Sequence, residues 1–170
     1  TVQATLPEWT NPKPDWRAEV RPTLTLNGQV ISGPMSFRGI EVESARSDLA
    51  YSDLTWRLPN LVARRPEGEV RMALRSHTGT QDFQIDFRSS IDPHAVTPAL
   101  EEEKQKKGFD FFSFDTPPVI EGRVWGRWRE QERTRFHATM AATNFTFRAQ
   151  QVDGFTAGMS FRDGLLTMTN

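Results

Sequence analysis

The residues that most often carry chemistry form no catalytic constellation in this chain. The three histidines, His77, His94 and His137, have no HxH or HExxH spacing, so solvated surface positions explain them better than a metal site. Asp115 and Glu121 flank a Pro-Pro turn as a glycosidase pair would, but a charged strand end is the simpler interpretation. The sequence also has no nucleophile elbow, no GxGxxG and no phosphate-binding loop. We therefore expect a protein that is not an enzyme and that binds no cofactor or metal.

Arginines form the densest polar feature, a basic ladder that includes Trp125. The simpler interpretation is a solvated outer face on which the arginines pair with Glu121, Glu130 and Glu132. The alternative is contact with lipid phosphates or polysaccharide, whose anionic groups guanidinium binds well. The members of the basic ladder are Arg123, Arg127, Arg129, Arg133 and Arg135.

The composition narrows the class of protein further. A net charge of −1 over 170 residues gives no bulk attraction to nucleic acid, so no nucleic-acid partner is expected. The absence of cysteine excludes disulfides, thiolate catalysis and cysteine-based zinc sites. With 12 phenylalanines and 5 tryptophans but a single tyrosine, the aromatic content is mostly apolar and favours cores or apolar surfaces. At this length we expect one structural unit.

Apolar and polar residues alternate along most of the chain, and this period of two predicts β-strands. Residues 70–75 and 83–88 are the clearest cases, because each wets one face and buries the other, as antiparallel sheets do. The dipeptide Asn27-Gly28 predicts a two-residue hairpin, and Pro59-Asn60 is expected to interrupt the chain. Gly122 and Gly126 fall on the apolar side of their strand, where they leave room for another element or a ligand, or let the strand coil.

Two segments depart from this pattern. Residues 1–22 hold four prolines, with Trp9 and Trp16 among them, a spacing that predicts an extended arm packed onto something rather than a helix. The only convincing helix lies near residues 92–107, where Asp92-Pro93 or Thr97-Pro98 would start it and Gly108 would end it. Its favourable charge pairs are Glu102 with Lys106 and Glu103 with Lys107. It has few apolar residues, so we expect it at the edge or end of the scaffold.

The chain repeats a pattern at an offset of 110 residues, from Phe37 to Phe147. The same offset aligns Arg38 with Arg148, and the strand phase predicts that the phenylalanines face inward while the arginines point outward. The offset is too long for a simple solenoid coil, so each copy is expected to be a module of several strands. Further aligned pairs are Val42 with Val152, Leu49 with Met159, Tyr51 with Phe161 and Asp53 with Asp163.

The order of several motifs resembles the repeat unit of large bacterial AsmA-like and TamB-like envelope proteins. The resemblance spans roughly residues 23 to 170 and consists of patterned apolar residues and glycines without a catalytic signature. It rests on Ile91-Asp92-Pro93, a short charged helix, Phe112-Ser113-Phe114, Pro117 to Gly126, Ala142 to Phe147 and Phe161 to Leu166.

This resemblance implies a periplasmic protein anchored in the inner membrane, whose repeats build a U-shaped β-groove with an apolar floor. Its partners would be phospholipid or another acyl-chain lipid and neighbouring repeats of the same chain, in support of outer-membrane biogenesis. The sequence shows no signal peptide or membrane span. It ends in mid-strand by pattern, so we expect it to be a piece of a longer protein.

The fold expected is mainly β: an antiparallel meandering sheet forming a groove, half-barrel or sandwich from repeated modules, with one short helix. Residues 23–170 would form a single β-rich unit, with an incomplete first copy at 23–91 and a second copy at 108–170. Whether the apolar faces close on each other or stay open is undecided by the sequence, and a closed β-sandwich that binds carbohydrate or protein is the alternative. An open groove would be lined by Ile120, Val124, Trp128, Phe136, Met140, Phe145, Phe147, Phe155, Met159 and Phe161.

Overall fold

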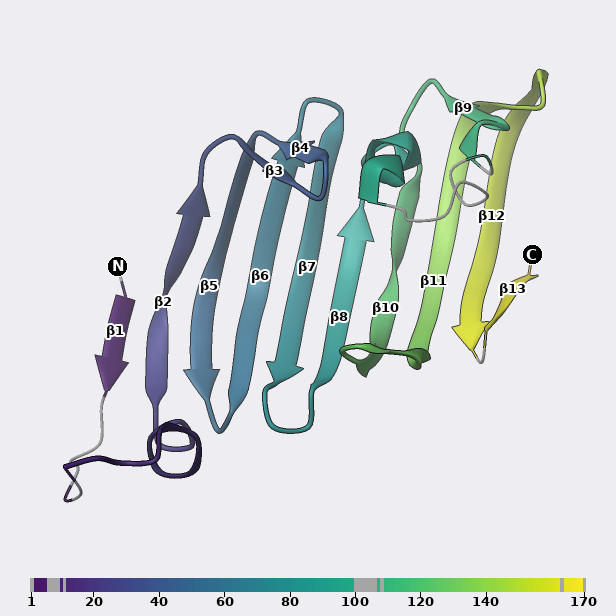
Figure 1. Cartoon of the computed structure of the whole chain (residues 1–170). Helices are drawn as coiled ribbons and strands as arrows, with labels where there is room; N and C mark the ends of the chain where they lie inside the picture. The colour runs from purple at the N-terminus through teal and green to yellow at the C-terminus, as the bar shows by residue number, and fades with distance from the viewer. Residues whose placement is uncertain are drawn as a thin grey trace.

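A single large antiparallel sheet dominates the computed structural model, as the alternating sequence predicts (Figure 1). The structure describes residues 2–5, 10, 12–99, 107, 109–162 and 164–169. The strands of the main sheet are β1 (Val2–Thr5), β2 (Thr25–Ser32), β5 (Ser44–Ser52), β6 (Thr55–Arg65), β7 (Gly68–His77), β8 (Asp82–Ser89), β9 (Phe112–Phe114), β10 (Val119–Arg127), β11 (Glu130–Phe147), β12 (Gln150–Arg162) and β13 (Leu165–Thr169). Two further strands, β3 (Met35–Phe37) and β4 (Ile40–Val42), form a separate hairpin.

The strands lie side by side almost in chain order, β1-β2-β5-β6-β7-β8-β10-β11-β12-β13. The short β9 pairs with the far end of β11, because β11 extends beyond β10. Within the described residues, β1 pairs only with β2 and β13 only with β12, so the sheet is open. The predicted mainly β, antiparallel meander is therefore confirmed, and its large sheet is not closed into a barrel.

Among the described residues, the short helices η1 and η2 lie outside the sheet. A 3-10 helix, η2, covers Pro93–Ala99, and it starts at the predicted place because Asp92 accepts a hydrogen bond from the backbone N–H of His94 at 2.9 Å. The rest of the predicted helix, with its Glu–Lys pairs at Glu102 and Glu103, lies largely outside the described residues. A π-helix, η1, covers Trp16–Val20 inside the segment predicted to be extended, and the Asp15 carboxylate caps it. That part of the arm prediction is therefore wrong.

Two turn signals in the sequence prove to lie inside strands. Asn27-Gly28 does not form a hairpin, because β2 runs on through it and Gly28 pairs with Leu49 of β5. Pro59-Asn60 is a β-bulge in β6, and the Asn60 side-chain oxygen accepts the backbone N–H of Asp48 at 2.8 Å. The side-chain hydrogen bond thus satisfies a backbone donor that the bulge leaves without a ladder partner.

The 110-residue repeat is visible in the strand register. The pairing of β2 with β5 and of β5 with β6 recurs, residue for residue, between β11, β12 and β13. The extent of whole copies, 23–91 and 108–170, stays a prediction. The recurring pairs are Leu26–Tyr51 with Phe136–Phe161, Gly28–Leu49 with Ala138–Met159, Tyr51–Trp56 with Phe161–Leu166, and Phe37–Ile40 with Phe147–Gln150.

The Phe-Arg motif itself marks a turn. Arg38 and Arg148 have φ of 50° and 48°, and each is the first residue of a two-residue hairpin turn. The prediction that both phenylalanines face inward is wrong for Phe37, which is 62% exposed on the separate β3–β4 hairpin. Pro34 precedes that hairpin, whereas the equivalent Asn144 keeps its strand in the sheet with a φ of 51°. Asparagine tolerates this left-handed conformation, which the proline ring forbids.

Candidate functional site: the apolar face of the sheet

The strand register places the apolar residues of the main sheet on one side, here called the apolar face. Residues directly opposite each other share a face, so the row Leu61, Met72 and Phe87 crosses β6, β7 and β8 without a polar member. A second row, Val124, Phe136 and Phe161, crosses β10, β11 and β12. The other side of the sheet carries arginines, carboxylates and small polar residues and is here called the polar face.

All ten residues predicted to line a groove lie on the apolar face. Seven share it through strand pairing: Ile120, Val124, Phe136, Met140, Phe155, Met159 and Phe161. Phe145 joins them because its ring lies 6.5 Å from the Phe155 ring, and Phe147 because its ring lies 5.0 Å from that of Phe112, which stacks with Phe114 and Phe145. Trp128 follows the end of β10 and stacks on Phe83 at 4.1 Å.

Most of the apolar face is half-buried, and its fully buried part is small. Phe145, Ala138, Ala142 and Ala157 are at most 3% exposed, whereas Trp128 is 41% and Phe147 36% exposed. At the C-terminal edge Leu166 and Met168 of β13 are each 55% exposed. A closed core would leave such side chains with only a few per cent of their surface in water, so this face remains partly accessible.

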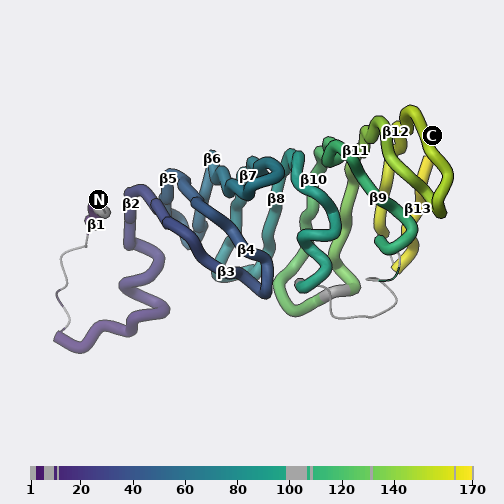
Figure 2. The backbone as a smooth tube through the Cα atoms, turned by 90° about the horizontal axis from the view of Figure 1, so that it is seen from above, coloured from purple at the N-terminus to yellow at the C-terminus, as the bar shows by residue number. Residues whose placement is uncertain are grey.

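Three elements lie over the apolar face (Figure 2). At the N-terminal end Tyr51 is 2% exposed and its hydroxyl donates to the carbonyl of Arg21, beside the fully buried Val20 of η1. Further along, the β3–β4 hairpin touches η2, since a Cβ on Gly39 would lie 2.9 Å from Pro98. Near the other end β9 places Phe112 and Phe114 against Phe145. The covers are therefore local and separate.

Gly122 and Gly126 allow a close approach of the paired strand β11, which an added Cβ would obstruct. A Cβ on Gly122 would lie 2.3 Å from the His137 carbonyl oxygen and 2.5 Å from the Ala138 Cβ. A Cβ on Gly126 would lie 2.9 Å from the Arg133 carbonyl oxygen. The second of the two expected roles, coiling of the strand, fits these contacts.

The basic ladder lies on and beside the polar face, largely engaged in ion pairs. Arg123 pairs with Asp86, and Arg127 with Asp82 at 3.2 Å and Glu130 at 3.4 Å. Arg133 pairs with Glu130 at 2.8 Å, and Arg135 donates to the Glu132 carbonyl. Glu121 pairs with Arg88 instead of the ladder. Arg129 lies in the turn after β10 with a φ of 69°.

The ion pair between Asp82 and Arg127 predicts a measurable titration. The Thr80 hydroxyl and the Arg127 guanidinium hold the pKa of Asp82 below its ordinary value. A lowered pKa in the folded state stabilises the fold above the unfolded-state pKa, and this stabilisation is lost as pH falls through the folded-state pKa. In a carbon-detected NMR titration, Arg127→Gln and Thr80→Val should each raise the midpoint of Asp82. Arg133→Gln should leave it in place, and an unchanged midpoint in all three variants would contradict the prediction.

The three histidines lie apart from one another, in a helix, a turn and a strand. The His94 ring contacts the Asp92 carboxylate at 2.7 Å and the Phe109 carbonyl at 3.0 Å, which ties η2 to the segment before β9. His77 accepts the backbone N–H of Thr80 at 2.9 Å in the β7–β8 turn, and His137 lies on the polar face opposite Arg123. Among the described residues, no three histidine, aspartate or glutamate side chains are placed to hold a metal ion.

The apolar face extends beyond the ten predicted residues, all of which lie in the second half of the chain. Leu49, Leu58, Leu74 and Ile85 extend the same face across β5 to β8. The alternation in residues 70–75 and 83–88 already carried this signal. What was missing was the register that joins these strands to β10 through pairs such as Ile85 with Val124.

No protein-family model, no curated protein and no solved structure matches this chain. In the part of the chain that the structure describes, no helix is long and apolar enough to cross a membrane. The functional interpretation therefore depends on the geometry of the sheet and on the resemblance noted in the sequence.

Proposed function

We propose that this chain is a non-enzymatic segment of a periplasmic AsmA-like envelope protein, in which the apolar face is a floor for the acyl chains of lipids. One observation supports this most: the apolar face continues across an open sheet from β2 to β13 and keeps large side chains partly accessible. A monomer rarely leaves so extended an apolar surface without a ligand or partner to cover it.

The free energy of burying an acyl chain on this face would hold a lipid and still let it slide. Each buried methylene group contributes about 0.8 kcal/mol, so an acyl chain of about a dozen methylenes would be held firmly on such a surface. Apolar contacts have no preferred direction, so a chain can shift along the face without breaking hydrogen bonds. The resemblance adds the location in the periplasm, an inner-membrane anchor in the parent protein and a role in outer-membrane biogenesis.

Photocrosslinking tests the proposal directly. A photoreactive residue at Met159, on the apolar face, should capture phospholipid when the protein is purified from cells or incubated with phospholipid vesicles. The matched control is Ser160, the next residue of β12, which points to the polar face opposite His137. Lipid adducts detected by mass spectrometry should be several times more abundant at Met159. Absent or equal adducts at the two positions would overturn the proposal.

A further inference from the structure

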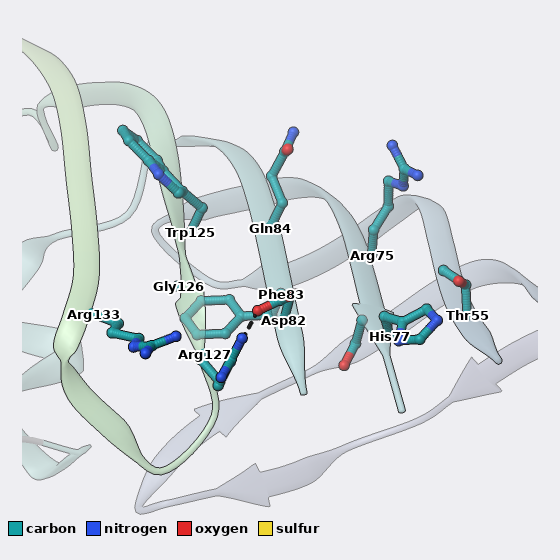
Figure 3. Close-up of a pocket in the computed structure, with 11 residues that line it drawn as sticks. Thr55, Arg75, His77, Asp82, Phe83, Gln84, Trp125, Gly126, Arg127 and Arg133 are labelled. Atoms are coloured by element: carbon teal, nitrogen blue, oxygen red, sulfur yellow. Dashed lines mark hydrogen bonds and ion pairs between the residues drawn. The ribbon is translucent and has the colours of Figure 1, made fainter. Parts of the chain in front are cut away.

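The polar face carries a transverse line of side chains that the lipid proposal does not use. Five residues lie directly opposite one another across β6, β7, β8, β10 and β11, and we name them the cationic row: Arg57, Arg75, Gln84, Trp125 and Arg135. The row contains three arginines, one amide, one indole and no carboxylate. Figure 3 shows Trp125, Gln84 and Arg75 side by side on neighbouring strands.

Two arginines in the row face each other, and no counter-ion lies beside them in the described part of the chain. Arg57 is directly opposite Arg75, an arrangement of like charges that destabilises a pair of strands. Arg57 donates to the Ser52 hydroxyl at 2.9 Å, and within the described residues no carboxylate forms an ion pair with either arginine. The other facing pair of arginines on this sheet differs, because Arg71 pairs with Glu69 and Arg88 with Glu121. An anion from outside the chain would complete the arrangement at Arg57 and Arg75.

The row borders a depression with an aromatic platform. The residues that line a hollow of about 500 Å³ include Arg75, Gln84 and Trp125 of the row and, from the neighbouring row, His77, Asp82 and Arg127. Trp125 is 40% exposed there, although a tryptophan on the wet side of a sheet loses apolar contact area. An exposed indole beside arginines and an amide suits a sugar ring, whose C–H groups lie on the indole while its hydroxyls bind the polar groups.

The carboxylates on either side of the cationic row favour a thin anionic chain over a broad anionic surface. Asp82 and Asp86 lie in the rows on either side of Gln84, each ion-paired with its own arginine. A broad anionic surface such as a membrane would meet these carboxylates, whereas a thin chain lying across the strands would meet only the cationic row. Neighbouring strands are about 4.8 Å apart, so Arg75 and Trp125 lie roughly 10 Å apart and one short saccharide unit can reach both.

We propose that the cationic row binds an acidic polysaccharide, with a sugar ring on Trp125 and carboxylate or phosphate groups on Arg75 and Arg57. The site is on the face opposite the proposed lipid floor, and its ligand is independent of the lipid. A saccharide chain bound there runs across the strands, along the long dimension of the sheet.

Isothermal titration calorimetry with an oligogalacturonate tests this proposal, and the neutral galactose oligomer of equal length is the comparison. The acidic oligomer should bind measurably, the neutral one at least about tenfold more weakly, and the affinity should fall as NaCl rises from about 50 to about 300 mM. Trp125→Ala and Arg75→Gln should each weaken binding about tenfold, while Trp125→Phe should retain most of it. Arg71 lies on the same strand and face as Arg75, and the Arg71→Gln variant should bind the acidic oligomer as tightly as the unsubstituted protein does.

Three outcomes of the calorimetry would overturn the proposal. These are no binding of the acidic oligomer, equal binding of the neutral oligomer, and an Arg75→Gln loss no larger than that of Arg71→Gln. Stronger binding to vesicles of anionic phospholipid than to the oligosaccharide would also overturn it, because the site would then be a lipid headgroup surface. All four substitutions lie at partly or fully solvated positions. The circular dichroism spectra of the variants should therefore match the spectrum of the unsubstituted protein.

Discussion

Replacing Phe145 with alanine is expected to lower the free energy of unfolding by about 3–5 kcal/mol. Phe145 is 3% exposed and lies at the centre of the aromatic cluster formed by Phe112, Phe114 and Phe155. Its truncation leaves a cavity beneath β9, a strand of three residues that depends on these contacts. Urea unfolding followed by tryptophan fluorescence measures the change.

Phe147→Ala is the matched control for that substitution. Phe147 lies two residues along the same strand and contacts Phe112 at 5.0 Å, but it is 36% exposed. Its truncation should cost less than half as much, because the neighbouring water already contacts the ring. Equal losses for the two variants would show that the buried cluster is not the support of β9.

Gly122→Ala is expected to destabilise the protein by about 3 kcal/mol, at the upper end of what added core atoms usually cost. The new methyl group would overlap the His137 carbonyl oxygen at 2.3 Å, and this atom belongs to the backbone of the paired strand. The β10–β11 ladder must therefore open locally to accept it. The unfolding midpoint in urea should fall, and hydrogen exchange should speed up at β10.

Two further variants separate this backbone overlap from a general effect of alanine. Gly33→Ala introduces the same methyl group where no atom lies within 4 Å, so its stability should change by less than about 0.5 kcal/mol. Adding Ala138→Gly to Gly122→Ala removes only the side-chain overlap at 2.5 Å, and it should restore stability in part. Full restoration would contradict the role of the His137 backbone.

The sequence predicted the β-rich class and the apolar face through simple alternation. The period of two assigns residues such as Val124 and Phe136 to the apolar side of their strands. Any strand pairing that keeps this period places them on the same face of the sheet. The 110-residue offset went further, because residues aligned by it, such as Tyr51 and Phe161, occupy equivalent positions in the strand register. A repeated sequence implies a repeated register even where the register itself is unknown.

Local turn chemistry was the main source of error. Asn27-Gly28 is a strong hairpin signal, but the strand continues because β1 and β5 pair with β2 on both of its sides. Pro59 is tolerated inside β6 because a bulge at this point breaks the pairing with both neighbouring strands. Long-range pairing thus outweighs the local preference, and a single sequence gives no measure of that pairing.

Contacts between segments that are distant along the chain could not be predicted from the sequence either. Nothing in the spacing of Trp128 indicates that its indole N–H donates to the Ser76 hydroxyl at 2.8 Å while the ring stacks on Phe83. The like-charge pair of Arg57 and Arg75 is equally invisible until β6 and β7 are set in register. The polar face appears in the sequence only as the basic ladder, whose members are mostly paired.

The repeat in register gives the sheet a modular length. From β2 to its equivalent β11 the sheet advances by six strands, in the order β2, β5, β6, β7, β8 and β10. Six is an even number, so each unit ends with the chain running in the direction in which it began, and with the apolar face on the same side. Duplication or deletion of one whole unit would lengthen or shorten the sheet by roughly 29 Å at a strand spacing of about 4.8 Å. Loss of a single strand would instead reverse the direction of every later strand and move each later loop to the opposite edge of the sheet. We therefore expect proteins built from this repeat to differ in length by whole units of six strands.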